Sequence, residues 1–142
     1  MNITKNFTLE ELTKSATADR LKINNEPAEQ ELNNLLVLCR DILQPIRDAY
    51  GKTIIVSSGY RCAKLNKAVG GSKTSQHVKG EAADIHTTSD TKASNKALFE
   101  LILDMVQKDK ITVGQLINEY DYNWIHVSLP TKDHKNQIFN IK

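Results

Sequence analysis

The chain has 142 residues, which is enough for one domain with one hydrophobic core. Its hydrophobic fraction of 39% and its charged fraction of 25% are ordinary for a soluble globular protein. A formal net charge of +2 is too small to argue for a nucleic-acid partner, and no stretch is long and apolar enough to span a membrane. We expect a single monomeric domain over residues 1–142, without a nucleic-acid partner or a membrane span.

The N-terminus and the two cysteines bear on the compartment in which the chain folds. The first seven residues lack the apolar segment of a secretory signal, so we expect a protein made in the cytoplasm or one that has lost a leader. Cys39 and Cys62 do not form a metal-binding pair, and Cys39 falls on the apolar side of a predicted helix. We expect Cys39 to be a buried free thiol, while a disulfide to Cys62 stays open because it depends on geometry.

The first half of the chain is predicted to be mainly helical. Thr8 and Glu11 fit a capping box, so a short helix should follow Thr8, and the polar residues 17–26 indicate a loop. Over residues 27–51, apolar side chains recur at intervals of three and four, which predicts a long amphipathic helix with a glycine as its stop. Pro45 lies inside this pattern and predicts a kink or a local break.

The second half of the chain alternates strands with helices. The predicted strands are residues 53–57, 81–87, 115–119, 124–129 and a short edge strand at 138–139, and the predicted helices are 61–69 and 97–106. The two strands from residue 115 onward are close enough in sequence to form a hairpin, with its turn at residues 120–123. This order indicates an α+β fold with a small, mainly antiparallel sheet packed with helices.

One segment offers the chemistry of a metal site. His77 in a loop and Asp84 in the following strand stand seven residues apart, with Gly80 between them to let the backbone bend. A third ligand is needed, and His126 is the best candidate, in a strand of aromatic and β-branched residues. Two imidazoles and a carboxylate suit a catalytic zinc site, which keeps one position open for water. The sequence therefore predicts Zn²⁺ held by His77, Asp84 and His126.

Each of these residues alone has an ordinary explanation, as an exposed loop histidine, a turn-capping aspartate or a hydrogen-bonded core histidine. Together they place an imidazole and a carboxylate in otherwise apolar strands, where each needs a partner. His86 competes as a ligand, because strand alternation puts it on the same face as Asp84. His134 lies in the polar tail, where we expect it to be exposed to solvent.

A hydrolytic zinc site also needs a general base near the bound water. If residues 122–123 form a two-residue turn, Glu119 stands directly opposite His126 on the same face of the hairpin. We therefore predict Glu119 as the catalytic base, its ordinary alternative being an edge-strand charge. Asp121 is the rival base, since it is also near the turn and on the same face.

Arg61 and Ser75 are the candidate substrate-binding residues. Arg61 follows a strand end, where sites commonly gather, and a guanidinium can hold a carboxylate or a developing oxyanion with paired hydrogen bonds. Its alternative is a surface arginine, and the alternative for Ser75 is to cap its loop. Four lysines nearby are either simply solvated or attract an acidic polymer. They are Lys64, Lys67, Lys73 and Lys79.

Three motifs, in this order, resemble those of the zinc D-Ala-D-Ala peptidase family. They are Ser-Ser-Gly-Tyr-Arg at residues 57–61, Ser-x-His-x-x-Gly-x-Ala-x-Asp at residues 75–84 and Trp-Ile-His-Val-Ser at residues 124–128. The middle motif is highly specific, and the resemblance runs from about residue 7 to residue 129. It points to the branch that includes peptidoglycan carboxypeptidases and phage-type endolysins.

The resemblance implies an α+β fold of the hedgehog/DD-peptidase type, with zinc held by His77, Asp84 and His126. It also implies that Arg61 contacts the substrate or stabilises the oxyanion. Members of this family cleave peptide bonds next to D-amino acids in bacterial cell-wall peptides, so the expected place of action is the cell wall or the periplasm.

One position departs from the pattern of that family. Many members carry an acidic residue or a histidine three positions before the last zinc histidine, whereas this chain has Asn123, which cannot take a proton. This departure makes Glu119 more attractive as the base. The sequence thus predicts a zinc metallopeptidase, of D,D-carboxypeptidase or endopeptidase type, that acts on peptidoglycan. The alternative from another class is a non-catalytic zinc-containing module of the same fold that binds cell-wall peptides.

Overall fold

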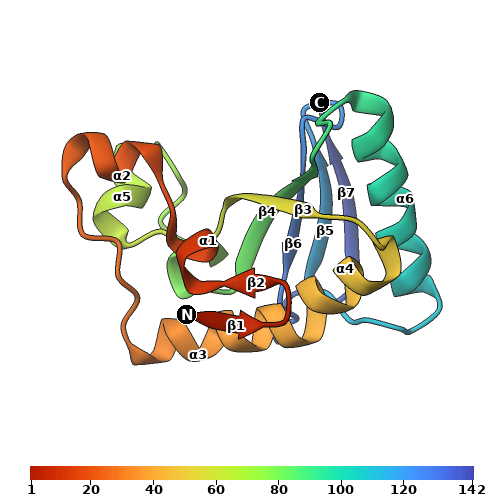
Figure 1. The fold of residues 1–142 in the computed structure, drawn as a ribbon, viewed down its shortest axis with the longest axis horizontal. Coiled ribbons are helices and arrows are strands. Elements are labelled where there is room, and N and C mark those ends of the chain that lie inside the picture. The colour runs from red at the N-terminus through yellow and green to blue at the C-terminus, as the bar shows by residue number, and fades with distance from the viewer.

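A computed structural model describes residues 1–142, and Figure 1 shows its elements arranged around a five-stranded sheet. In spatial order the strands are β3 (Ile54–Ser58), β4 (Ala82–Thr87), β6 (Trp124–Ser128), β5 (Gln115–Glu119) and β7 (Gln137–Ile141). Neighbouring strands are antiparallel, except that β5 and β7 are parallel. The predicted α+β fold with a mainly antiparallel sheet is confirmed, and β7 is the predicted edge strand.

Helices lie on both sides of this sheet. In Figure 1, α6 (Lys92–Gln107) runs along one side, while α2 (Ala16–Leu21) and α5 (Ala63–Ala68) lie together on the other. The remaining elements are α1 (Leu9–Thr13), α3 (Glu29–Leu38), α4 (Gln44–Tyr50) and an antiparallel ribbon of β1 (Asn2–Thr4) and β2 (Phe7–Thr8). None of the helices combines the length and the apolar character that crossing a membrane requires.

The long helix predicted before the first strand is interrupted near its proline, as expected. α3 ends at Leu38, a π-helical turn covers Cys39–Leu43, and α4 begins one residue before Pro45. Proline has no backbone N–H to donate and crowds the preceding turn, and the wider π turn accommodates both effects. α4 then ends at Gly51, whose φ of 75° is the left-handed conformation of a helix stop.

The loop predicted at residues 17–26 is wrong in its first part, because α2 occupies Ala16–Leu21. Ser15 begins this helix by accepting a hydrogen bond of 3.1 Å from the amide of Ala18, and Ala18 is buried. Six residues are too few to show an apolar period, so the serine cap was the one local signal for the helix.

Alternation along the strands separates the hydrophobic core from the polar face of the sheet. Ile85, Ile125 and Val127 are fully buried in the core, so the residues between them, including Asp84 and His126, point to the opposite face. The helices contribute to the same core Leu35, Leu38, Ile42, Leu98 and Ile102. The core therefore fixes which strand residues face the space between the sheet and α5.

Both cysteines are free thiols. Cys39 is fully buried in the core, as predicted, and burial raises the pKa of its thiol to about 12. Cys62 is half-buried, and its sulfur accepts a hydrogen bond of 3.4 Å from the amide of Leu65 at the start of α5. Cys39 is therefore neutral near pH 7 and behaves as a small apolar residue.

Candidate active site

Asp84 and His126 are brought together by strand pairing. They are direct partners in the antiparallel register of β4 and β6. Side chains of such a pair lie side by side on one face of the sheet, and here His126 Nδ1 lies 3.0 Å from Asp84 Oδ1. Two of the three predicted metal-binding residues are therefore adjacent because of the sheet register, although they are 42 positions apart in sequence.

His77 comes to the same place from a different element, a 3₁₀ turn at Gln76–Lys79. Gly80 ends this turn with a φ of 73°, and a side chain there would collide with the carbonyl of Glu31, so the predicted bend at this glycine is confirmed. The imidazole is 3% exposed, and its Nδ1 lies 2.7 Å from the carbonyl oxygen of Gly59. Because a carbonyl only accepts, Nδ1 carries the proton and Nε2 keeps a free lone pair.

The three candidate ligand atoms face one another. His77 Nε2 lies 3.4 Å from Asp84 Oδ1, and all three ligand atoms lie within 4.8 Å of one another. Burial alone would raise the pKa of Asp84, but the adjacent rings of His126 and His77 outweigh it and hold that pKa well below its usual range. The group therefore combines one ionised carboxylate with two imidazoles, which is a set that could hold a metal ion.

Arg61 and Ser75 lie on the wall that faces the sheet. The amide of Arg61 donates to the carbonyl of His77 at 3.1 Å, which ties the segment after β3 to the 3₁₀ turn. Ser75 Oγ accepts from the amide of His77 at 3.2 Å and from Arg61 Nη2 at 3.3 Å. The capping alternative for Ser75 is therefore observed, and the same hydroxyl orients the guanidinium.

The Arg61 guanidinium is held in a partly desolvated position. Its Nε is buried and has no hydrogen-bond partner within the chain. Burial lowers the pKa of Arg61, while the nearby carboxylates of Asp84 and Glu119 oppose that shift. An arginine pKa is so high that the group stays charged, so Arg61 contributes a positive charge to the cleft that it lines.

The predicted hairpin register is wrong by two residues. Glu119 pairs with Trp124, and the residue directly opposite His126 is Ile117. Because strand side chains alternate, Glu119 still shares a face with His126, but its Cα is displaced by about 7 Å along the strand. Glu119 is half-buried, and its Oε2 accepts a hydrogen bond of 2.7 Å from Trp124 Nε1.

The register shift follows from an unusual turn. The loop has four residues instead of two, and Tyr120, Asp121 and Tyr122 all have positive φ, at 51°, 58° and 65°. Left-handed backbone at a residue other than glycine costs on the order of 1 kcal/mol each. The turn must therefore be held by contacts elsewhere in the fold.

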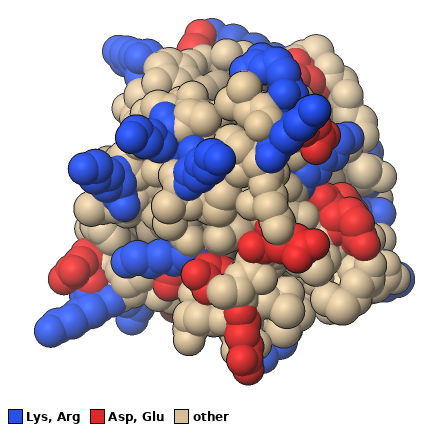
Figure 2. Space-filling model, turned by 90° about the vertical axis from the view of Figure 1, so that its left-hand side faces the viewer, with Lys and Arg blue, Asp and Glu red and all other residues tan.

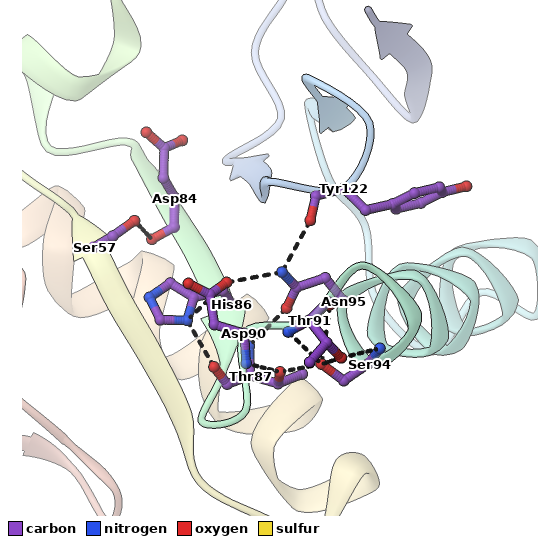
Figure 3. Close-up of polar contacts among 9 residues, drawn as sticks. All are labelled: Ser57, Asp84, His86, Thr87, Asp90, Thr91, Ser94, Asn95 and Tyr122. Carbon is purple, nitrogen blue, oxygen red and sulfur yellow. Dashed lines mark hydrogen bonds and ion pairs between the residues drawn. The ribbon is translucent and has the colours of Figure 1, made fainter.

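Asn95 supplies one contact that holds this turn, as Figure 3 shows. This residue of α6 is 1% exposed, and its Nδ2 donates to the carbonyl of Tyr122 at 2.9 Å and to Asp90 at 3.0 Å. Its Oδ1 accepts from the amide of Thr87 at 3.0 Å, at the end of β4. A second support is the side chain of Asn118, which accepts from the Tyr122 amide at 2.6 Å.

The rival residues lie apart from the group of three. Asp121 forms an ion pair of 2.7 Å with Lys92 of α6, and exposed Asn123 donates its amide to the carbonyl of Glu119. His86 shares the strand face with Asp84, but Figure 3 shows its ring beside Asp90 and Thr87, with Nδ1 2.6 Å from the Thr87 carbonyl. The structure therefore brings Glu119 to the cleft and leaves Asp121 and His86 outside it.

The predicted residues line one cleft of about 620 Å³. Its lining includes His77, Asp84, His126, Arg61, Ser75 and Glu119, together with Ile117, Trp124 and Tyr120 on the sheet side and residues 69–72 and 74 on the opposite side. The expectation that His134 is exposed to solvent is wrong, because this residue is half-buried and lines the same cleft. Its position depends on the tail pairing with β5, a long-range contact without a local sequence signal.

The chain matches one known protein family. The family model described as peptidase M15 matches residues 5–128, which is most of the chain. The chain belongs to the peptidase M15 family. This is the family of zinc-dependent D-Ala-D-Ala peptidases, so membership supports a metallopeptidase and confirms the resemblance found in the motifs. No curated protein matches the chain.

Proposed function

We propose that this M15 protein is a zinc metallopeptidase that hydrolyses peptide bonds next to D-amino acids in peptidoglycan peptides. The observation that carries the proposal is the convergence, in one cleft, of a His-Asp-His group, a free carboxylate and a partly desolvated guanidinium. These are the groups that metal-assisted peptide hydrolysis requires. The D-amino-acid specificity rests on the family and its motifs.

The donor set fits zinc in both chemistry and spacing. Tetrahedral zinc with bonds of about 2.0–2.1 Å places its ligand atoms roughly 3.3 Å apart. The two measured separations from Asp84 Oδ1, 3.0 Å to His126 and 3.4 Å to His77, bracket that value. In this proposal His77 binds through Nε2, because the Gly59 carbonyl occupies its Nδ1. A bound zinc ion would polarise the scissile carbonyl and lower the pKa of a water molecule.

Glu119 is proposed as the general base. It shares the strand face of His126 and lines the cleft, and its carboxylate, like that of Asp84, acts electrostatically on Arg61. One oxygen accepts the Trp124 indole N–H, which fixes the orientation of the carboxylate and leaves the other oxygen to take a proton. The same carboxyl group can then return that proton to the leaving amine.

Arg61 is proposed to bind the substrate and to balance charge in the transition state. Its guanidinium lines the cleft and stays charged, so its terminal N–H groups could bind a substrate carboxylate or a developing oxyanion. Ser75 holds one end of the guanidinium at 3.3 Å, so the group needs little reorganisation when substrate arrives. Ser75 is proposed to contribute to substrate binding mainly through this arginine.

A pair of stereoisomeric peptides tests the proposal. The zinc-loaded protein is incubated with a synthetic cell-wall stem peptide that ends in D-Ala-D-Ala, and separately with the diastereomer that ends in L-Ala-L-Ala. The released amines are quantified. We expect hydrolysis of the D-peptide only. Hydrolysis of the terminal L-Ala-L-Ala bond as fast as the D-Ala-D-Ala bond would remove the proposed specificity, and binding of the D-peptide without cleavage at any of its bonds would favour the non-catalytic module.

A further inference from the structure

The charges of the chain are segregated along the sequence. Between Asp48 and Glu81 there is no acidic residue, whereas this stretch contains six basic ones. They are Lys52, Arg61, Lys64, Lys67, Lys73 and Lys79. Since the whole chain carries a net charge of only +2, the remaining residues are acidic on balance. A local positive surface therefore exists that the overall composition conceals.

Four of these lysines, at positions 64, 67, 73 and 79, are exposed and form no ion pair. Lys64 and Lys67 belong to α5, Lys73 to the loop that follows it and Lys79 to the end of the 3₁₀ turn, and α5 lies with α2 on one side of the molecule. Figure 2 shows that side, with lysine and arginine side chains gathered toward its upper left and acidic side chains more frequent in its lower half. None of these four lysines therefore has a carboxylate within ion-pair distance.

Lys67 and Lys73 border a hollow that adjoins the active-site cleft. The hollow is lined by Ala63, Asn66, Lys67, Gly70, Gly71, Lys73 and Val78. Gly70 and Gly71 also line the cleft, so these glycines form a wall shared by the two cavities. A ligand longer than the cleft can therefore pass over this wall and continue beside the two lysines.

The shared wall is fixed to α5. Asn66 is 4% exposed, and its Nδ2 donates to the carbonyl of Ser72 at 2.8 Å. A side chain at Gly71 would collide with the Asn66 side-chain oxygen, so this position needs glycine. The spacing between the lysines and the cleft is therefore set by the fold.

We propose that the surface formed by Lys64, Lys67, Lys73 and Lys79 binds carboxylate groups of the peptidoglycan network that lie outside the scissile peptide. This inference rests on the proposed function and specifies a polymeric, acidic substrate. The hollow is continuous with the cleft, so a polymer whose scissile peptide occupies the cleft can extend into the hollow. The part of the polymer that reaches the lysines then belongs to the same substrate molecule, which favours this ligand. Remote binding of this kind raises local substrate concentration and helps to position the scissile bond.

A sedimentation assay with charge-neutral variants tests the surface. Insoluble peptidoglycan is prepared with and without removal of its attached phosphate polymers, and co-sedimentation of the zinc-loaded protein is measured at low and high NaCl concentration. The test variant is Lys67→Gln with Lys73→Gln. The control is Lys96→Gln with Lys110→Gln, which removes the same charge from exposed lysines without ion pairs, the first on α6 and the second just beyond it.

We expect the Lys67/Lys73 variant to bind stripped peptidoglycan about 5-fold to 10-fold more weakly at low salt, with the difference vanishing at high salt. The control should bind like the wild type, and all proteins should hydrolyse the short D-Ala-D-Ala stem peptide equally. Equal weakening of both variants would overturn the inference, and so would a defect seen only on phosphate-bearing material. Failure of the wild type to hydrolyse any peptide would instead contradict the proposed function. The co-sedimentation of the two variants would still decide whether the lysine surface binds peptidoglycan.

Discussion

Glu119 and Trp124 face each other across the β5–β6 hairpin, and the indole Nε1 donates a 2.7 Å hydrogen bond to Glu119 Oε2. This contact orients a carboxylate at the edge of the cleft that contains His77, Asp84 and His126. A glutamine at position 119 would keep an acceptor for the indole but could not take a proton. Substitution there can therefore separate a catalytic role from a structural one.

The first prediction concerns the base. Glu119→Gln should keep the fold and the zinc content but lower the hydrolysis rate on the order of 10²-fold or more, as removal of a general base does. Asp121→Asn should be nearly silent, because Asp121 pairs with Lys92 outside the cleft. The three proteins are compared by initial rates at matched zinc content. An inactive Asp121→Asn beside an active Glu119→Gln would assign the base to the turn instead of the strand.

The departure at Asn123 gives a companion test of the same assignment. Asn123→Asp should change the rate little, because this exposed residue does not line the cleft. In the Glu119→Gln background, the carboxylate introduced at position 123 could restore part of the activity. It can do so only if the turn allows that carboxylate to reach the cleft. A large gain from Asn123→Asp alone would show that Glu119 is not the base.

The second prediction concerns the metal. We expect one zinc per chain in the wild type and its loss in His77→Ala and in His126→Ala, because two protein ligands hold zinc poorly in water. His86→Ala serves as the control, since its ring lies against Asp90 and Thr87. Elemental analysis of the four purified proteins is the measurement. Full zinc occupancy in both alanine variants, or its loss in the control, would require a different ligand set.

The third prediction concerns Arg61. Arg61→Lys keeps a positive charge but loses the planar fork and the bond to Ser75, so it should impair turnover strongly. Lys96→Arg, at an exposed position of α6, is the control substitution. The measurement is kcat/KM on a D-Ala-D-Ala stem peptide. Wild-type kinetics for Arg61→Lys would reduce Arg61 to a structural residue.

The fourth prediction concerns the turn that follows Glu119. Asn95→Ala removes the donor to Tyr122 and leaves the Thr87 amide unpaired, so the free energy of unfolding should fall by about 1–3 kcal/mol. Alanine is the better helix former, so helix propensity cannot explain a loss. Asn33→Ala, at an exposed position of α3, should be nearly neutral in the same denaturant titration.

Asn95→Ala should also lower kcat, because the turn positions Glu119. The contrary result is an Asn95→Ala protein that is less stable than the wild type but has the same kcat and KM at low temperature. In that case the turn would have no part in orienting the base.

The local features of the site were predictable from the sequence. His77, Gly80 and Asp84 fall within one short segment, so their spacing in the sequence predicts the turn and the strand on which they lie. The Pro45 break and the Gly51 stop were predictable for the same reason, since each residue has a strong backbone preference of its own. Patterns of this range need no knowledge of distant contacts.

The predictions that were wrong concern features that depend on contacts between distant parts of the chain. The hairpin register requires three left-handed residues, of which Tyr122 is held by Asn95 of α6, and no glycine marks that turn. The place of His134 depends on the parallel pairing of β7 with β5. Sequence periodicity gives the face of a strand but not its partner, so Glu119 was placed on the correct face and two residues out of register.

The central claim is that the protein hydrolyses peptidoglycan through the cleft described above. Its most direct test is digestion of purified peptidoglycan by the zinc-loaded wild type, with Glu119→Gln at equal zinc content as the blank, followed by mass analysis of the soluble products. We predict products cut at a bond next to a D-amino acid, which appear with the wild type and are at least about 10²-fold scarcer in the blank. No cleavage product from fully zinc-loaded wild type, or equal products from both proteins, would contradict the account.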